Sequence, residues 1–431
     1  MQNQIVDITD LSHDGRGVAH VDGKTMFVIG ALPGERAEVR VASRRRSFDE
    51  ARIETLLVRS PERIEPRCPH FGTCGGCALQ HLPVVAQIRA KQRVLAENFE
   101  RIGKVAPERW LDALTDAAWG YRRKGRLSVK WVDKKGRALV GFREENPRFV
   151  ADLTECHTLL PEVGQRIAAI GELVSSLDAR RDIAQIEIAA GDDVVALVFR
   201  HLRPLADADT AKLIEFGKRH DLAIMLQPGG PDSVHALWPD APQLSFRIDD
   251  AGIEIAFAPL DFVQVNAGMN RRMITRAIEL LDPRPADRVL DLFCGLGNFT
   301  LPVARRAGEV VGVEGEAGLV ARARANAAAN GVGNASFEAA DLAVDQRTSP
   351  WATRDYEKIL LDPPRSGAAA VLEYLPRKSA RSIVYVSCHP ASLARDAGTL
   401  VHRHGFSLRA AGVMDMFPHT AHVESIALFE R

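Results

Sequence analysis

The strongest constraint on the fold is the strict alternation of strand and helix patterns from residue 287 to the C-terminus. Short apolar strand patterns such as RVLDLFC, EVVGVEG and SIVYVSC alternate with helical patterns such as GLVARARANAAANG. Parallel strands need such crossovers, so the alternation predicts a doubly wound, mostly parallel sheet of the α/β class. In a sheet of this kind ligands bind beyond the carboxyl ends of the strands, where functional residues are therefore expected.

Two further domains are expected before this sheet, because 431 residues is about three times the usual domain length. Residues 1–60 alternate short β-branched runs with Gly, Asp-Gly and Pro-Gly turns, which predicts a small β-barrel. Residues 61–255 mix strand patterns such as RLSVKWV with helical patterns such as GQRIAAIGELVSSL, which indicates an α+β domain. Residues 256–431 then form the α/β domain.

Composition excludes several classes of protein. A hydrophobic fraction of 46% with 26% charged residues argues for packed cores rather than disorder. The start MQNQIVDITD does not look like a signal peptide, and no apolar run approaches the ~20 residues of a membrane span. We therefore expect a cytoplasmic protein without a membrane partner, and no obligate protein partner is evident. Thiols stay reduced in the cytoplasm, so clustered cysteines favour metal ligation over disulfides.

The 56 basic and 56 acidic residues cancel, but residues 121–137 (YRRKGRLSVKWVDKKGR) carry eight Lys or Arg against one Asp. Basic side chains contact phosphates and neighbouring aromatic rings stack on bases, so this segment is a candidate RNA-binding surface. A strand pair with a solvated, charged outer face would give the same pattern.

A glycine-rich turn follows the first strand of the alternating region, in VLDLFCGLGNFT. Gly295 and Gly297 allow a tight turn and a close approach to a ligand. A dinucleotide fingerprint would need a third glycine where Thr300 stands, which disfavours a dinucleotide-dependent oxidoreductase. Glu314 ends the next strand and can bind ribose hydroxyls, while Asp341 follows the third strand and can reach an adenine edge. The pattern favours a nucleoside cofactor over an ordinary turn flanked by capping acids.

Cys388 ends the strand IVYVSC, directly before His389, Pro390 and a helical pattern. A helix N-terminus lowers the pKa of a thiol toward the reactive thiolate, so we expect Cys388 to be a nucleophile with a lowered pKa. Cys294 lies within the cofactor turn and is expected to be a small buried residue.

Five motifs together resemble the RNA (uracil-C5)-methyltransferase family: DFVQVN (261–266), DLFCGLGNF (291–299), LDPPRSG (361–367), VSCHPASLARD (386–396) and HVESI (422–426). The resemblance implies a Rossmann-like S-adenosylmethionine-dependent methyltransferase domain at the C-terminus and an RNA-binding TRAM barrel at the N-terminus. It also implies a [4Fe-4S] cluster in the central domain. These features occur together in members that methylate uracil 1939 of 23S rRNA, whereas the tRNA-specific relative lacks the barrel and the cluster. The implied product is 5-methyluridine, and the implied partner is 23S rRNA.

The resemblance also assigns roles to residues. Cys388 would add to C6 of the uracil, so that C5 can attack the cofactor methyl group, and Glu424 would then remove the C5 proton. Phe262 would stack on the flipped-out base. The implied cofactor-binding residues are Gln264, Phe293, Asn298, Glu314, Asp341 and Asp362. His389 departs from the family, which commonly has Asn there, and this puts the fine positioning of the loop in question.

The cysteines of CPHFGTCGGC, Cys68, Cys74 and Cys77, are three expected metal ligands, with Cys156 as the fourth. Four thiolates suit zinc or an iron–sulfur cluster, and the residues alone do not separate the two. The spacing lacks the paired C-x2-C knuckles typical of structural zinc, and the resemblance favours [4Fe-4S]. Two alternatives remain for the whole chain: the same chemistry on another rRNA or tRNA uridine, and a non-catalytic iron–sulfur scaffold that binds RNA.

Overall fold

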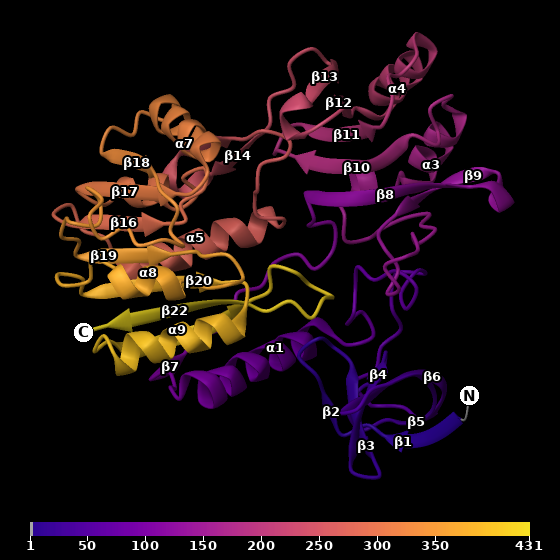
Figure 1. Cartoon of the computed structure of the whole chain (residues 1–431), viewed down its shortest axis with the longest axis horizontal. Coiled ribbons are helices and arrows are strands. Elements are labelled where there is room, and N and C mark those ends of the chain that lie inside the picture. The colour runs from indigo at the N-terminus through magenta and orange to yellow at the C-terminus, as the bar shows by residue number, and fades with distance from the viewer. Residues whose placement is uncertain (1–2) are drawn as a thin grey trace.

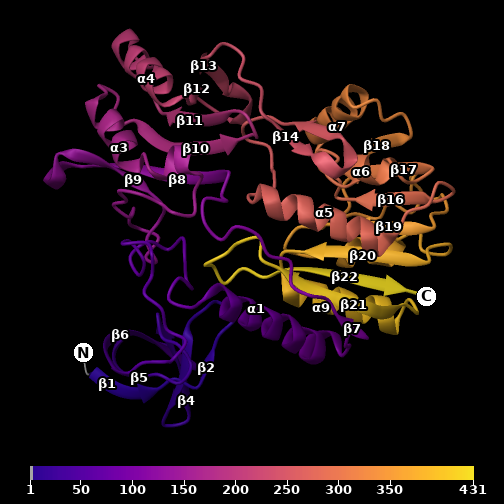
Figure 2. The ribbon, with the colours of Figure 1, turned by 180° about the vertical axis from the view of Figure 1, so that it is seen from behind.

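The computed structural model describes residues 3–431; residues 1–2 of the predicted barrel lie outside the described part. The chain forms three lobes (Figure 1): a small barrel at the N-terminus, a central domain, and a larger C-terminal domain. The view from behind shows the same division (Figure 2).

The N-terminal lobe is a sheet in the order β1-β5-β6-β4-β3-β2. Its strands are β1 (Asn3–Asp7), β2 (Asp10–Leu11), β3 (Gly17–Val21), β4 (Lys24–Ile29), β5 (Arg36–Arg44) and β6 (Phe48–Val58). Alternate side chains of β5, Ala37, Val39 and Val41, point into the core, where they meet Met26 and Val28 of β4. Every second residue of β5 is buried, as expected for a strand with one face in the core, and these side chains complete the small core of the barrel.

The central lobe has a six-stranded sheet in the order β13-β12-β11-β10-β8-β9. Its strands are β8 (Lys124–Val132), β9 (Arg137–Gly141), β10 (Ile183–Ala190), β11 (Val195–His201), β12 (Ala223–Gln227) and β13 (His235–Trp238). The helix α3 (Ile167–Ser176) packs on β9, α4 (Asp207–His220) packs on β12, and the short α2 (Pro161–Gly164) precedes α3. The opposite face of the sheet joins the core of the C-terminal domain.

The C-terminal sheet has the order β18-β17-β16-β19-β20-β22-β21-β7. Its parallel part comprises β16 (Arg288–Leu292), β17 (Glu309–Glu314), β18 (Ala335–Ala339), β19 (Lys358–Leu361) and β20 (Ser382–Ser387). The strand β22 (Glu424–Glu430) runs antiparallel to both β20 and β21 (Ser407–Met414). The strand order reverses between β16 and β19, so the doubly wound sheet predicted from the alternation is confirmed, with a ligand crevice at that switch point.

Helices cover both faces of this sheet, because its strands are apolar on both sides. One face packs against α5 (Ala267–Leu281), α6 (Thr300–Ala304) and α7 (Ala317–Ala329). The other face packs against α1 (Val84–Asn98), α8 (Ala369–Tyr374) and α9 (Pro390–His402). In β20, Val384 and Val386 enter the first core, while Ile383 and Tyr385 enter the second.

Two segments within the range predicted as the central domain pack on the C-terminal domain instead. The helix α1 and the π-helical turn η1 (Phe99–Gly103) lie against α9, and β7 (Arg109–Trp110) pairs with β21. The hairpin of β14 (Ser245–Ile248) and β15 (Ile253–Ala256) packs on α7 through β15. Sequence patterns place an amphipathic helix but not the sheet that it covers, so this long-range docking was not foreseen.

The basic segment 121–137 is mostly engaged within the protein. Arg123 pairs with Asp192, Lys124 donates to the carbonyl of Pro259, and Arg126 pairs with Glu187. Lys135 and Arg137 share the carboxylate of Asp152 at 2.7 and 2.5 Å. These contacts tie the segment to its own domain, but Arg126, Lys135 and Arg137 stay about half exposed or more, so contact with RNA stays a prediction. Among residues 3–431, no helix is both long and apolar enough to cross a bilayer.

Candidate active site

The turn after β16 forms one wall of the crevice. Gly295 and Gly297 have φ of +53° and +89°, the left-handed region that favours glycine. The hydroxyl of Thr300 donates to the carboxyl of Asp291 at 2.5 Å. Burial raises the pKa of Asp291 to about 7. Thr300 therefore replaces the third glycine of a dinucleotide fingerprint with a side chain that fixes the buried acid.

Two of the three acids predicted for the cofactor, Glu314 and Asp341, stand at the carboxyl ends of neighbouring strands. Glu314 ends β17, and its carboxylate accepts the backbone N–H groups of Gly295 at 3.1 Å and Gly315 at 2.7 Å. Asp341 follows β18 and is exposed. The strands β16, β17 and β18 are consecutive neighbours, so the structure brings the Gly turn and both acids to one edge.

The remaining predicted cofactor residues border the same turn. Phe293 follows β16 with φ of +66°, and the side-chain amide of Asn298 exchanges two hydrogen bonds with that of Asn270 on α5, at 2.9 and 3.0 Å. Asp362 follows β19 and donates its backbone N–H to the carbonyl of Leu292 at 3.3 Å.

Gln264 and Phe262 lie in the segment between β15 and α5. Asn266 caps α5 by accepting the N–H of Met269 at 3.2 Å, and Lys124 holds the segment through its backbone carbonyls. Phe262 is 72% exposed, which is unusual for a large apolar side chain and leaves its ring free to stack on a ligand.

Strand pairing brings the predicted nucleophile and base together. Cys388 directly follows β20, Glu424 begins β22, and the antiparallel register of these two strands pairs Ser387 with Ser425. Extension of that register by one residue puts Cys388 opposite Glu424. The two side chains, 36 residues apart in the sequence, therefore meet at one end of the sheet.

The electrostatics of this pair differ from the expectation. Burial, with the nearby carboxyls of Glu424 and Asp362, raises the pKa of the Cys388 thiol to about 11, although Arg365 opposes the shift. The prediction of a lowered thiol pKa is therefore wrong for the ligand-free chain, because desolvation outweighs the helix N-terminus. Burial and Asp362 raise the pKa of Glu424 to about 8.

His389, the departure from the family pattern, supplies the N-cap of α9. Its Nδ1 atom accepts the backbone N–H of Ser392 at 3.3 Å, as an Asn side chain does at this position. The loop that carries Cys388 therefore keeps a side-chain cap despite the substitution.

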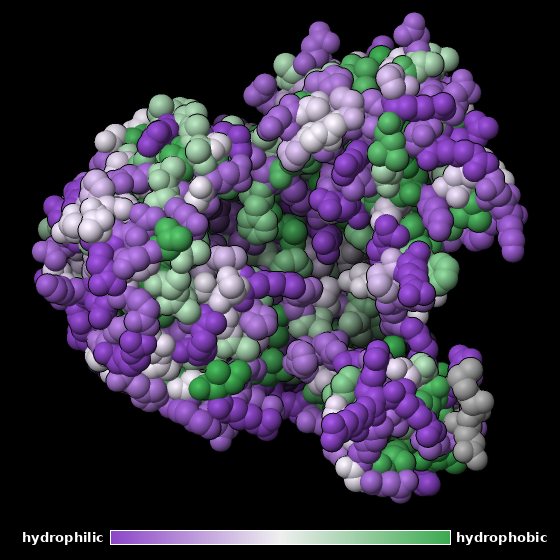
Figure 3. All heavy atoms as spheres, viewed as in Figure 1, coloured by the Kyte–Doolittle hydropathy of each residue, from purple (hydrophilic) through white to green (hydrophobic). Residues whose placement is uncertain are grey.

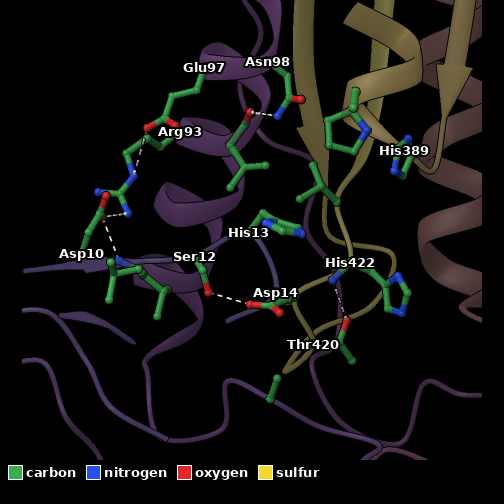
Figure 4. Close-up of a pocket in the computed structure, with 18 of the residues that line it drawn as sticks. Asp10, Ser12, His13, Asp14, Arg93, Glu97, Asn98, His389, Thr420 and His422 are labelled. Atoms are coloured by element: carbon green, nitrogen blue, oxygen red, sulfur yellow. Dashed lines mark hydrogen bonds and ion pairs between the residues drawn. The ribbon is translucent and has the colours of Figure 1, made fainter. Parts of the chain in front are cut away.

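Cys388 opens into a cleft of about 920 Å³ between the barrel and the C-terminal domain. The space-filling view shows the hollow between the lobes (Figure 3). His13 and Asp14 come from the barrel, Arg93 and Glu97 from α1, and His422 from the loop before β22 (Figure 4). Its volume lies at the upper end of the range of small-molecule and cofactor pockets.

The four predicted metal ligands also come together. Cys68, Cys74, Cys77 and Cys156 line one small cavity of about 20 Å³. Burial raises the pKa of Cys74 to about 11 and that of Cys77 to about 12, and the neighbouring thiols add to both shifts. Within residues 3–431, no cluster of three or more His, Cys, Asp or Glu side chains has the geometry of a closed metal site.

Sequence reasoning missed several residues that support the site. Arg365 lies in the quoted LDPPRSG motif, and its Nη2 atom lies 3.1 Å from Nδ1 of His422. Lys91 and Asp415 form a buried ion pair at 2.6 Å, with each side chain 3% exposed. Lys91 lies on an amphipathic helix, and nothing in the sequence indicates that it is buried. Arg365 directly follows Pro363 and Pro364, and this position could have singled it out.

Comparison with known proteins decides the family. The 23S rRNA (uracil(1939)-C(5))-methyltransferase RlmD of Xylella fastidiosa is 61% identical over 433 residues, covering 100% of this chain and 97% of that protein. The chain belongs to the RNA (uracil-C5)-methyltransferase family. The enzyme of the same name from Xanthomonas campestris pv. campestris is also 61% identical, covering 98% of this chain and 96% of its own length.

Family models and a solved structure agree with this membership. The tRNA (Uracil-5-)-methyltransferase model matches residues 239–431, and the TRAM domain model matches residues 2–53. The fold is similar to that of Pyrococcus abyssi tRNA (uracil-54, C5)-methyltransferase in complex with S-adenosyl-L-homocysteine, with a TM-score of 0.75 and 23% identity. That likeness covers 99% of this chain and 100% of the other. The predicted family, TRAM domain and S-adenosylmethionine-dependent methyltransferase fold are confirmed.

Proposed function

We propose that the chain transfers a methyl group from S-adenosylmethionine to C5 of uracil 1939 in 23S rRNA, forming 5-methyluridine. The observation that carries the proposal is the register of β20 and β22: Ser387 pairs with Ser425, so that the adjoining residues Cys388 and Glu424 lie opposite each other, and Cys388 lines the large cleft. Its relatives with 61% identity over almost the full chain, named for that nucleotide, support the choice of substrate.

Cys388 and Glu424 act in sequence. The Cys388 thiol would give its proton to solvent and its sulfur would add to C6 of the uracil, so that the C5–C6 double bond becomes an enolate with nucleophilic C5. Bound S-adenosylmethionine would supply the methyl group to C5, with its sulfur–methyl bond breaking and S-adenosylhomocysteine as the leaving group. Glu424, after losing its own proton to solvent, would remove the C5 proton as the carboxylate; the double bond would re-form and the cysteine would leave C6 as the thiolate.

The residues around the crevice would hold the cofactor and the base. Glu314 would accept hydrogen bonds from the ribose hydroxyls and Asp341 would bind the adenine edge. Phe262 would stack on the flipped uracil, which its 72% exposure permits. The full proposed cofactor-binding set is Gln264, Phe293, Asn298, Glu314, Asp341 and Asp362.

Cys68, Cys74, Cys77 and Cys156 would hold a [4Fe-4S] cluster. The donor set fits, because four thiols from two distant segments line one cavity and the raised pKa values of Cys74 and Cys77 leave their unligated thiolates unfavourable. A cationic metal centre would offset that repulsion, and bound zinc is the alternative. Methyl transfer moves no net electron, so the cluster would be structural.

Methyl transfer to unmodified 23S rRNA and to tRNA tests the function, with anaerobically purified protein and mapping of the modified position. We expect one 5-methyluridine in 23S rRNA, and Cys388→Ala should abolish transfer while RNA binding persists. Transfer to tRNA alone, or to another rRNA position, would contradict the proposed substrate. RNA binding without transfer by the native chain would indicate a scaffold.

Iron and acid-labile sulfide analysis tests the cysteine site. The native chain should contain about four irons per molecule, and Cys156→Ser should lose them and weaken folding or RNA binding. Cys294→Ser, a change at a buried cysteine outside the cavity, serves as the control. Normal iron content in Cys156→Ser, or zinc in place of iron in the native chain, would overturn the assignment.

A further inference from the structure

The loop between β21 and β22 ends at Glu424 and reaches away from the sheet, toward the start of α1 (Figure 1). His419, at the tip of this loop, is 3% exposed and has φ of +66°. A histidine in that left-handed conformation needs surrounding contacts to hold it. The contacts come from the residues after Cys77, from α1 and from Trp119, whose ring also meets that of His157 beside Cys156.

The first contact joins His419 to the residues that follow Cys77. The backbone N–H groups of Ala78 and Leu79 both donate to the carbonyl of His419, each at 2.9 Å. The cysteine loop and the loop before Glu424 are therefore bonded backbone to backbone, although more than 300 residues separate them in the sequence.

Gln87 of α1 stabilises the contact between the cysteine loop and the loop before Glu424. Its side chain is fully buried, and its Oε1 atom accepts the N–H of His419 at 2.8 Å. Its Nε2 atom lies 3.0 Å from the carbonyl of Leu79, 2.7 Å from that of Leu82 and 3.2 Å from Nδ1 of His419. One amide thus bonds both loops at once, and loss of it would leave several buried polar groups without partners.

A second contact leads to the other cysteine segment. The ring of Trp119 stacks on that of His419 at 3.8 Å and meets the ring of His157, the neighbour of Cys156, edge-on at 6.2 Å. Lys91, one helical turn after Gln87, anchors the same loop through Asp415 and the carbonyl of Phe417. The loop before Glu424 is therefore held directly by α1 and by the residues after Cys77, and it is linked to the Cys156 segment through Trp119.

We infer that Gln87 and His419 form a positioning link that makes the placement of Glu424 depend on the order of the cysteine site. The inference rests on the proposed roles of Glu424 and of the cysteines. It gives the cysteine site a task in a reaction that needs no electron transfer: to hold the loop that ends in the base. A misplacement of about 1 Å at a reacting group can cost about 100-fold in rate.

Hydrogen exchange tests the link without reference to activity. Gln87→Met keeps the length of the side chain and removes its hydrogen bonds; it should speed amide exchange in both 78–82 and 415–423. Cys77→Ser should do the same. The matched control is Asn334→Leu, which removes an amide that bonds three carbonyls at the far edge of the sheet, and it should leave both segments unchanged. Faster exchange confined to 78–82 would overturn the inference.

A double-mutant cycle tests the effect on catalysis. Gln87→Met and Cys77→Ser should each lower kcat by about 10- to 100-fold with S-adenosylmethionine affinity nearly unchanged, and their combination should fall little below the worse single variant. If the two losses in kcat multiplied in full in the double variant, the two residues would act independently, and this result would overturn the coupling. If Gln87→Met fails to fold, Trp119→Leu tests the second contact with the same readouts. Absence of methyl transfer by the native chain would contradict the proposed function, while the exchange experiment would still test the link.

Discussion

Cys388 and Glu424 are two acids whose protons are retained by burial. Their pKa values of about 11 and about 8 mean that Cys388 is a thiol and that Glu424, in neutral solution, is mostly a carboxylic acid. Two neighbouring anions in a desolvated site would repel each other, which disfavours ionisation of both groups together. Catalytic groups with such shifted values are typical of functional sites.

Glu424→Gln should stabilise the fold at alkaline pH. The carboxyl of Glu424 has an ordinary pKa of 4.5 when unfolded and about 8 when folded, so unfolding releases a proton between these values and stability falls as pH rises through that window. Gln cannot ionise, so the variant should gain about 4 kcal/mol over the native chain at pH 8. The gain should vanish below pH 4.5. Urea unfolding at both pH values measures it, and an equal gain at both would contradict the shifted pKa.

At the scale of elements, the site is assembled by strand ends and helix starts. The register of β20 and β22 sets Cys388 beside Glu424, while the N-cap of α9 fixes the turn in which Cys388 lies. The neighbouring strands β16, β17 and β18 align the Gly turn with Glu314 and Asp341. Glu314, Cys388 and Glu424 lie at the ends of buried strands, so the core that stabilises the sheet also fixes their positions.

The cap of α9 can be tested by exchange of one side chain. His389→Asn should retain folding stability and methyl transfer, because Asn is among the most favourable N-caps. His389→Ala should lose about 1 kcal/mol of unfolding free energy, because the N–H of Ser392 loses its acceptor. Urea unfolding and single-turnover rates of the two variants measure this. If His389→Asn were as damaging as His389→Ala, His389 would have a role beyond capping.

At the scale of the whole molecule, a small apolar joint connects the barrel to the rest. Leu11 and Leu32 of the barrel pack with Leu79 and Leu82 of the cysteine segment and with Ala86 of α1. The ion pair between Asp10 and Arg93, at 2.7 Å, crosses the same joint. This joint sets the width of the cleft, because the barrel and α1 form its opposing walls.

Leu32→Ala should loosen the barrel from the other lobes. Leu32 is fully buried in the joint, so its truncation should cost about 2–5 kcal/mol and speed proteolysis in the linker at residues 59–66. Val28→Ala, at an equally buried site inside the barrel core, is the control. We expect Leu32→Ala to weaken RNA binding more than Val28→Ala does when both are folded. Equal effects on RNA binding would show that the joint does not shape the cleft.

The α/β sheet, the family and the candidate catalytic and cofactor-binding side chains could all be predicted from the sequence. Alternating patterns report which residues are buried locally, and motifs such as DLFCGLGNF occur where backbone geometry and chemistry both restrict the residue type. Gly295, Glu314 and Cys388 could therefore be singled out without coordinates, and the structure puts all three at strand ends.

The packing of distant segments and the pKa values of the site residues depend on the tertiary structure and could not be predicted from the sequence. The docking of α1 and β7 on the C-terminal sheet, the junction of Gln87 with His419 and the burial of Lys91 depend on contacts between residues hundreds of positions apart. The pKa of Cys388 was predicted to fall and instead rises, because burial is a property of the folded surroundings and not of the neighbouring residues in the chain.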